Sequence, residues 1–132
     1  MIAADTSTWV AFLKGSRGED TDWLDRALED SQLVMVPVVL TELLSDPKLS
    51  SDVTETIAQV PLIEITSGSW QRAAALRAKV LEKGRKARLG DALIAQSCID
   101  HGIPLITRDR DFRSFAEAAN LNVVFGIGPG RS

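Results

Sequence analysis

Four carboxylates of the chain lie beside apolar segments, where a soluble protein seldom needs a charge. Asp5 follows the apolar stretch MIAA, and Asp109 comes two residues after the apolar, β-branched stretch PLIT at residues 104–107. Glu42 lies within the apolar segment VVLTELL, and Asp91 precedes the apolar segment ALIAQSCI. Carboxylates held against a protein core are the groups that bind divalent cations or transfer protons. These four acids are therefore the first candidates for a catalytic site.

Each acid also has an ordinary structural role open to it, and taken singly that role is the commoner outcome. Asp5 can cap a helix, and Asp91 can interact favourably with the dipole at a helix N-terminus. Glu42 can face solvent or pair with an arginine, although its apolar neighbours predict that it is half-buried. Asp109 can be a turn residue. One shared site would explain all four acids together.

The apolar pattern predicts how these acids could meet. Stretches with the character of strands lie at residues 1–5, 33–37, 61–65, 104–108 and 121–125. Segments with helical spacing of apolar residues lie at residues 6–15, 20–31, 38–46, 51–60, 67–84, 91–102 and 114–120. This alternation predicts βαβ units and an α/β fold with a parallel sheet covered on both faces. Ligands of such open sheets bind beyond the carboxyl ends of the strands, where Asp5 and Asp109 fall.

All four acids would converge on one crevice if the five predicted strands were ordered 3-2-1-4-5. Two carboxylates about 5 Å apart repel each other by roughly 3 kcal/mol at an effective dielectric constant of about 20. Four ionised carboxylates therefore need compensation, either by sharing protons or by holding a divalent cation. Oxygen ligands without a neighbouring histidine or thiolate favour Mg²⁺ or Mn²⁺.

The composition indicates an ordinary soluble domain. The chain has 132 residues, of which 45% are hydrophobic and 25% charged. Its single cysteine, Cys98, cannot form an internal disulfide, and the N-terminus lacks the pattern of a signal peptide. No apolar run approaches the roughly 18 residues of a membrane helix. We expect a cytoplasmic protein without membrane association, with one domain at residues 1–125 and a loose tail at residues 126–132.

Charge is distributed unevenly along the chain, whose formal net charge is −3. Residues 72–88 contain seven lysines and arginines and one glutamate. Such a run is more often a solvated helix face with a basic loop, but it can also form a rim that contacts nucleic-acid phosphates. Its position just before Asp91 favours the rim. The candidate phosphate contacts are Arg85, Lys86, Arg88 and, beside Asp109, Arg108 and Arg110.

Four motifs together resemble one family of nucleases. They are DTSTW at residues 5–9, the glutamate of VLTELL, GDALIAQSC at residues 90–98 and LITRDRDF at residues 105–112. In this order and spacing they are similar to the PIN-domain ribonucleases and, within these, to the VapC-type toxins of toxin–antitoxin pairs. The resemblance covers nearly the whole chain. It implies a three-layer α/β/α sandwich around a central parallel five-stranded sheet, and hydrolysis of RNA phosphodiester bonds with Mg²⁺ or Mn²⁺.

The resemblance also implies roles for individual residues. It implies a catalytic quartet of acids, Asp5, Glu42, Asp91 and Asp109. The expected metal ligands, direct or through water, are Asp5, Asp91 and Asp109, with Asp111 as a further ligand. Glu42 is either a ligand or the base that orients the attacking water. Ser7 and Thr107 match hydroxyl positions that support the acids or a water.

The resemblance implies three partners: an RNA substrate, a second copy of the chain in a homodimer, and a small VapB-type antitoxin. The antitoxin would push a segment, often with an arginine, into the acidic site. Two other interpretations remain open. One is a receiver-like or phosphatase-like domain phosphorylated on Asp5, against which Ser7 stands where a second aspartate would be expected. The other is a non-catalytic PIN-like module that binds RNA or a protein.

Overall fold

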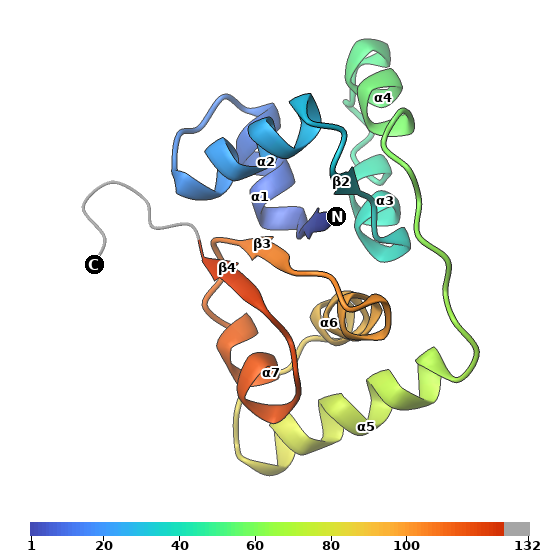
Figure 1. Cartoon of the computed structure of the whole chain (residues 1–132), viewed down its shortest axis with the longest axis vertical. Helices are drawn as coiled ribbons and strands as arrows, with labels where there is room; N and C mark the ends of the chain where they lie inside the picture. The colour runs from blue at the N-terminus through green and yellow to red at the C-terminus, as the bar shows by residue number, and fades with distance from the viewer. Residues whose placement is uncertain (126–132) are drawn as a thin grey trace.

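The computed structural model describes residues 1–125, which form seven helices around a parallel sheet (Figure 1). The strands are β1 Ile2–Ala4, β2 Leu33–Val34, β3 Leu105–Thr107 and β4 Val123–Phe125. The helices are α1 Thr6–Leu13, α2 Glu19–Glu29, α3 Pro37–Leu44, α4 Ser51–Ala58, α5 Ser69–Glu82, α6 Leu89–His101 and α7 Phe112–Ala118. None of these helices has the length and apolar character needed to cross a membrane. The tail predicted at residues 126–132 lies outside the described residues.

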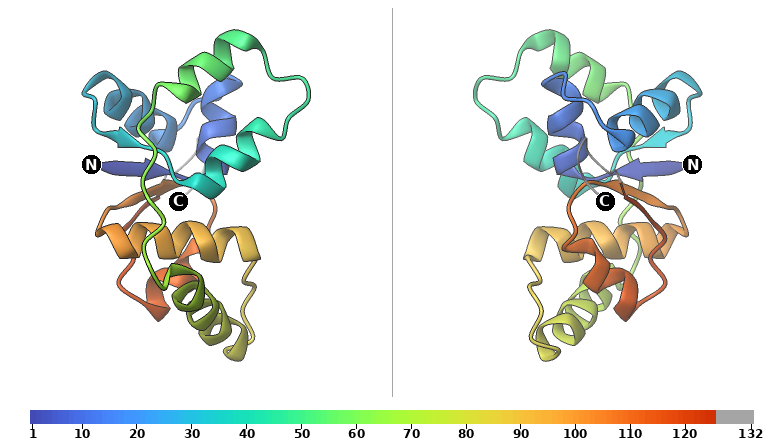
Figure 2. Two further views of the ribbon diagram at one scale, coloured as in Figure 1. Left: turned by 90° about the vertical axis from the view of Figure 1, so that its right-hand side faces the viewer. Right: turned by 90° about the vertical axis from the view of Figure 1, so that its left-hand side faces the viewer.

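The helices form two layers, one on each face of the sheet. Helices α1, α2, α3 and α4 lie on one side, and α5, α6 and α7 lie on the other, as the two side views show (Figure 2). The central strand residues Ala3, Leu105 and Ile106 have no exposed surface, as expected for strands covered on both faces. The predicted α/β/α sandwich with a central parallel sheet is confirmed.

The sheet has the predicted order but fewer strands than predicted. Its four strands are parallel in the order β2-β1-β3-β4. The prediction of a fifth strand at residues 61–65 was wrong, because this segment forms an isolated parallel bridge between Leu62 and Met35. Two backbone hydrogen bonds of 2.7 and 3.0 Å join Met35 to the residues on either side of Leu62. The pairing cannot continue, since the chain after Met35 enters α3 at Pro37. Residues 61–65 still lie next to the segment that follows β2, on the side of the sheet where the prediction placed them.

Large apolar side chains hold the layers against the sheet. Trp9 of α1, Leu24 of α2, and Phe112 and Phe115 of α7 are fully buried. Burial of a side chain of this size contributes on the order of 1.5–3 kcal/mol to stability. This packing holds β1 and β3 side by side, and the backbone N–H of Asp5 donates to the carbonyl of Ile106 at 3.0 Å. Residues that follow these two strands are thereby brought to one edge of the sheet.

Candidate metal centre

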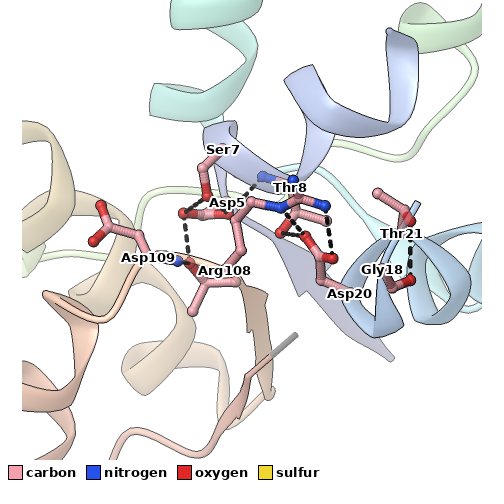
Figure 3. Close-up of polar contacts among 9 residues, drawn as sticks. Asp5, Ser7, Thr8, Gly18, Asp20, Thr21, Arg108 and Asp109 are labelled. Atoms are coloured by element: carbon pink, nitrogen blue, oxygen red, sulfur yellow. Dashed lines mark hydrogen bonds and ion pairs between the residues drawn. The ribbon is translucent and has the colours of Figure 1, made fainter. Parts of the chain in front are cut away.

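Asp5 caps α1 and is held from two elements (Figure 3). It is 3% exposed, and its carboxylate accepts the N–H of Thr8 at 3.0 Å and the hydroxyl of Thr107 at 2.7 Å. The hydroxyl of Ser7 lies 2.9 and 2.8 Å from the two carboxylate oxygens. Burial raises the pKa of Asp5, although the hydrogen bonds from Thr107, Thr8 and Ser7 oppose the rise. The capping role is present, and the hydrogen bond from Thr107 of β3 is an addition that a helix cap does not require.

Asp91 lies in the first turn of α6, one turn after the N-cap residue Arg88. Burial is the main reason why the pKa of Asp91 is raised to about 6. The negative charges of the other three predicted acids act in the same direction, and the charge of Arg88 opposes them. Its Oδ2 atom is buried and has no hydrogen-bond partner among the residues that the structure describes. An unpartnered carboxylate oxygen facing other acids is an available position for a cation.

Asp109 and Asp111 form a carboxylate cluster with Asp91, in which one oxygen of each lies within 4.8 Å of the others. The turn between β3 and α7 places both side chains. The N–H of Asp109 donates to the hydroxyl of Thr107 at 2.9 Å, and Asp109 Oδ1 accepts the N–H of Asp111, also at 2.9 Å. Lys86 Nζ lies 3.6 Å from Asp111 Oδ2, so part of the negative charge is compensated at the rim.

Glu42 reaches the cluster from α3. Its carboxylate accepts a hydrogen bond from the hydroxyl of Thr6. It also lies close to Gly90, where the Cβ of any other residue would be 3.5 Å from Glu42 Oε2. Since Gly90 precedes Asp91, Glu42 borders the start of α6. The prediction that Glu42 is half-buried was wrong, because α3 turns the adjacent Leu43 into the core and leaves Glu42 exposed.

The structure brings the predicted acids together at the carboxyl edge of the sheet. Asp91, Asp109 and Asp111 are the tightest group, and the buried Asp5 and the exposed Glu42 are close enough for their charges to raise the pKa of Asp91. The two predicted hydroxyls, those of Ser7 and Thr107, both donate to Asp5. A ligand set made of carboxylate oxygens, with one of them unpartnered, fits Mg²⁺ or Mn²⁺.

The predicted phosphate contacts fall into two groups. Four of them are exposed: Arg85, Lys86, Arg88 and Arg110. Of these, Lys86 lies near Asp111, and the charge of Arg88 acts on Asp91. Arg108 differs, because its guanidinium forms a bidentate pair with Asp20 at 2.7 and 2.9 Å. The donors that Arg108 would offer to a phosphate are therefore engaged within the protein, and it is not among the contacts proposed below.

Asp20 is a residue of this region that the sequence patterns did not single out. It is 1% exposed, and it accepts the hydroxyl of Thr8 at 3.0 Å in addition to the guanidinium of Arg108. Burial would raise the pKa of Asp20, but hydrogen bonds from Arg108 and Thr8 outweigh burial and lower it. A signal was present in the sequence, since Asp20 shares a helical face with the buried Leu24 and Ala27.

Known proteins share both the sequence pattern and the fold. Residues 2–118 match the family model of the PIN domain. The chain is 27% identical over 129 residues to Ribonuclease VapC5 of Mycobacterium tuberculosis, covering 91% of each protein. It is similar to the crystal structure of VapBC2 from Rickettsia felis bound to a promoter DNA fragment, with a TM-score of 0.70, 20% identity, and coverage of 95% of this chain and 98% of that one. For VapBC-5 of Mycobacterium tuberculosis, of the VapBC family of toxin–antitoxin systems, the TM-score is 0.67 at 22% identity, with coverage of 94% and 97%. At these identities the two structures support the fold alone.

Proposed function

The chain belongs to the PIN domain family, and we propose that it is a divalent-metal-dependent endoribonuclease that acts as the toxin of a toxin–antitoxin pair. The observation that carries the proposal is the cluster of Asp91, Asp109 and Asp111, whose oxygens lie within 4.8 Å of one another. The similarity to a relative of nearly equal length that is named a ribonuclease supports the reaction.

Mg²⁺ or Mn²⁺ is the proposed cofactor. Asp91, Asp109 and Asp111 would hold it through carboxylate oxygens, with the unpartnered Oδ2 of Asp91 as the first candidate ligand atom. Asp5 would contact it through water, because both of its oxygens already accept hydrogen bonds within the protein. When bound, the ion supplies an activated water and neutralises charge on the scissile phosphate.

Glu42 is the proposed general base. Its carboxylate is exposed beside the cluster and lies outside the tightest group of oxygens, so it can orient a water and take up its proton. Thr107 has a different task. Its hydroxyl donates to Asp5 and accepts the N–H of Asp109, so this one side chain fixes two acids relative to each other.

RNA is the proposed substrate, and exposed cations around the cluster would contact its phosphates. A polyanion cannot approach a cluster of carboxylates without compensation, and basic side chains at the rim supply part of it. Lys86 lies 3.6 Å from Asp111, and Arg88 interacts with Asp91. The other proposed contacts are Arg85 and Arg110, both exposed. Phosphorylation of Asp5 is not proposed, because its carboxylate is buried and engaged by three residues.

A VapB-type antitoxin is the proposed protein partner, and the toxin–antitoxin complexes among similar structures support it. A groove of about 310 Å³ lies between α1, α3 and α4, and Glu42 is one of its lining residues. Its apolar lining includes Val10, Leu13 and Val53. An antitoxin segment would pack its apolar side chains there and direct an arginine toward the acidic cluster, where the charges are complementary.

The proposed assembly is a homodimer in the cytoplasm. Large apolar side chains remain exposed on the single chain, among them Trp23 at 45%, Trp70 at 58% and Leu89 at 61%. Tryptophan is enriched at protein interfaces, so Trp23 and Trp70 are the first candidates for the dimer surface.

The test of the proposed function is cleavage of a mixed pool of structured RNA by the purified protein without antitoxin. The reactions contain EDTA, Mg²⁺ or Mn²⁺, and they compare the wild type with Asp91→Asn and with Glu55→Gln, a charge-matched change on an exposed face of α4. We expect metal-dependent cuts by the wild type and by Glu55→Gln, and none by Asp91→Asn. Full cleavage by Asp91→Asn, or cleavage in EDTA, would contradict the proposal. RNA binding without cleavage under any metal would favour the non-catalytic module.

A further inference from the structure

An ion pair between the half-buried Arg108, which follows β3, and the buried Asp20 of α2 joins these two parts of the chain (Figure 3). Arg108 Nε lies 2.7 Å from Asp20 Oδ2, and Arg108 Nη2 lies 2.9 Å from Asp20 Oδ1. The side chain of Asp20 is 1% exposed, whereas that of Arg108 is 33% exposed. The proposed cleavage reaction uses neither residue, so the pair needs an explanation of its own.

The contacts of this pair close a ring that passes through Asp5. The hydroxyl of Thr8 donates to Asp20 at 3.0 Å, while the N–H of the same Thr8 donates to Asp5 at 3.0 Å. On the other side, the hydroxyl of Thr107 donates to Asp5 at 2.7 Å, and Arg108 is the next residue along the chain. The ring therefore runs from Asp5 through Thr8, Asp20 and Arg108 to Thr107 and back to Asp5.

We propose that Asp20 and Arg108 are positioning residues of the candidate metal centre, which fix Asp5 and Asp109 relative to each other. Asp5 directly follows β1, and Asp109 directly follows Arg108 after β3, so the two acids belong to separate segments. The Asp20–Arg108 pair joins the residue just before Asp109 to α2. Thr8 of α1 donates to both Asp20 and Asp5, so it connects α2 to Asp5. This inference rests on the proposed function, because it assigns a task within the same site.

Stability alone does not explain the pair. Burying the carboxylate of Asp20 has a desolvation cost that its attraction to Arg108 often only offsets, and apolar residues of similar size are frequently as stable. What a bidentate arginine–carboxylate pair provides is a fixed direction and distance. Residues that orient metal ligands in this way typically change metal affinity by about 10–100-fold when they are replaced.

Gly18 offers a way to disturb the pair without changing a charge. A Cβ at this position would lie 2.7 Å from Asp20 Oδ1 and 3.1 Å from Arg108 Nη2, so Gly18→Ala must displace the carboxylate. The backbone of Gly18 is extended, with φ of 166°, and alanine adopts that conformation readily. The effect of Gly18→Ala is therefore steric and directed at the pair.

The chain also contains a matched control pair. Arg72 Nε and Nη2 lie 2.9 and 2.8 Å from the two carboxylate oxygens of Asp100, and this pair joins α5 to α6. Neither residue contacts the acids of the cluster in any interaction that the structure describes. Arg72→Lys therefore loses the same kind of bidentate contact without touching the ring.

The experiment is a calorimetric titration of the full chain with Mn²⁺ alone, well below the unfolding temperature of every variant. It compares the wild type with Arg108→Lys, Gly18→Ala, Arg72→Lys and Asp91→Asn. We expect the Kd for Mn²⁺ to rise about tenfold in Arg108→Lys and in Gly18→Ala. Arg72→Lys should stay within about twofold of the wild type, whatever its loss of thermal stability.

The outcomes separate this inference from the proposed function. One outcome is that the wild type binds Mn²⁺ and Asp91→Asn does not, while Gly18→Ala and Arg108→Lys keep the wild-type Kd. This outcome overturns the positioning role and leaves the proposed function standing. An equal rise in Arg72→Lys would also overturn it, since the effect would then be general loosening. If the wild type does not bind Mn²⁺, the proposed function falls and the inference falls with it. If Arg108→Lys does not fold, Gly18→Ala decides alone.

Discussion

Replacing Asp91 by asparagine should stabilise the metal-free protein at neutral pH. The pKa of Asp91 is about 6 in the folded protein, compared with 3.8 for an unperturbed aspartate, so folding disfavours its ionised form. The folded state therefore binds this proton more tightly than the unfolded state. The ionised Asp91 therefore lowers the free energy of unfolding. This decrease reaches its full size above about pH 6 and disappears as the pH falls toward 3.8. Asparagine carries no charge, so the variant avoids this decrease at every pH.

The magnitude follows from the shift in the pKa. A difference of about two pKa units corresponds to about 3 kcal/mol, since one unit is about 1.36 kcal/mol. Asp91 is only partly buried, and solvent screens its interactions with the neighbouring acids, so we expect a gain of about 1–2 kcal/mol. For a domain of this size such a gain raises Tm by about 4–8 °C.

The assay is thermal unfolding followed by circular dichroism in EDTA, at pH 7.5, 6.0 and 4.5. The control is Glu55→Gln, which removes one negative charge from an exposed position and reports the effect of net charge alone. We expect the advantage of Asp91→Asn over the wild type to be largest at pH 7.5 and to shrink at pH 4.5. An Asp91→Asn protein that is no more stable than Glu55→Gln at pH 7.5 would refute the idea that burial and repulsion make the ionised Asp91 destabilising.

Three further predictions concern the metal and the RNA. Mn²⁺ at a hundred times its Kd should stabilise the wild type by about 2.7 kcal/mol in thermal unfolding, and a similar gain in Asp109→Asn would count against the ligand assignment. The Mn²⁺ affinity should fall as the pH drops below about 6, because Asp91 then takes up a proton; calorimetric titrations at pH 5.0 and 7.5 that agree would contradict this. The RNA prediction uses the inactive Asp91→Asn protein, to which Arg85→Ala and Lys86→Ala are added together. Loss of two phosphate contacts should make the plot of log affinity for single-stranded RNA against log salt concentration less steep by about 1.4. Lys79→Ala, at an exposed position of α5 that is not among the proposed phosphate contacts, should leave that slope unchanged.

The position of the acids could be predicted because it depends on local patterns and on one general rule. Asp5 and Asp109 follow apolar strands, and parallel strands in an α/β sheet present their carboxyl ends at one edge. The order of the strands then brings Asp91 and Glu42 to the same place. Each of these steps uses only the apolar pattern of a local segment. None of them requires knowing which residue far away in the sequence a side chain contacts.

Two features could not be predicted because they depend on residues far away in the sequence. They are the absence of a strand at residues 61–65 and the ion pair of Arg108. Residues 61–65 have strand character, but the strand beside them ends at Val34 and α3 begins at Pro37. Arg108 flanks Asp109 and looks like a rim residue, yet its partner Asp20 lies 88 positions away in the sequence. A charged residue on the buried face of α2 indicates that it needs a charged or hydrogen-bonding partner, but not which one.

The most direct test of the central claim is a crystal of the protein soaked with Mn²⁺ and measured at an X-ray wavelength where manganese scatters anomalously. We expect an anomalous peak among the carboxylates of Asp91, Asp109 and Asp111, at distances that permit direct oxygen ligation, and no such peak in Asp91→Asn. Anomalous density confined to other parts of the molecule, with these three side chains unchanged, would contradict the assignment of this edge of the sheet as the metal centre.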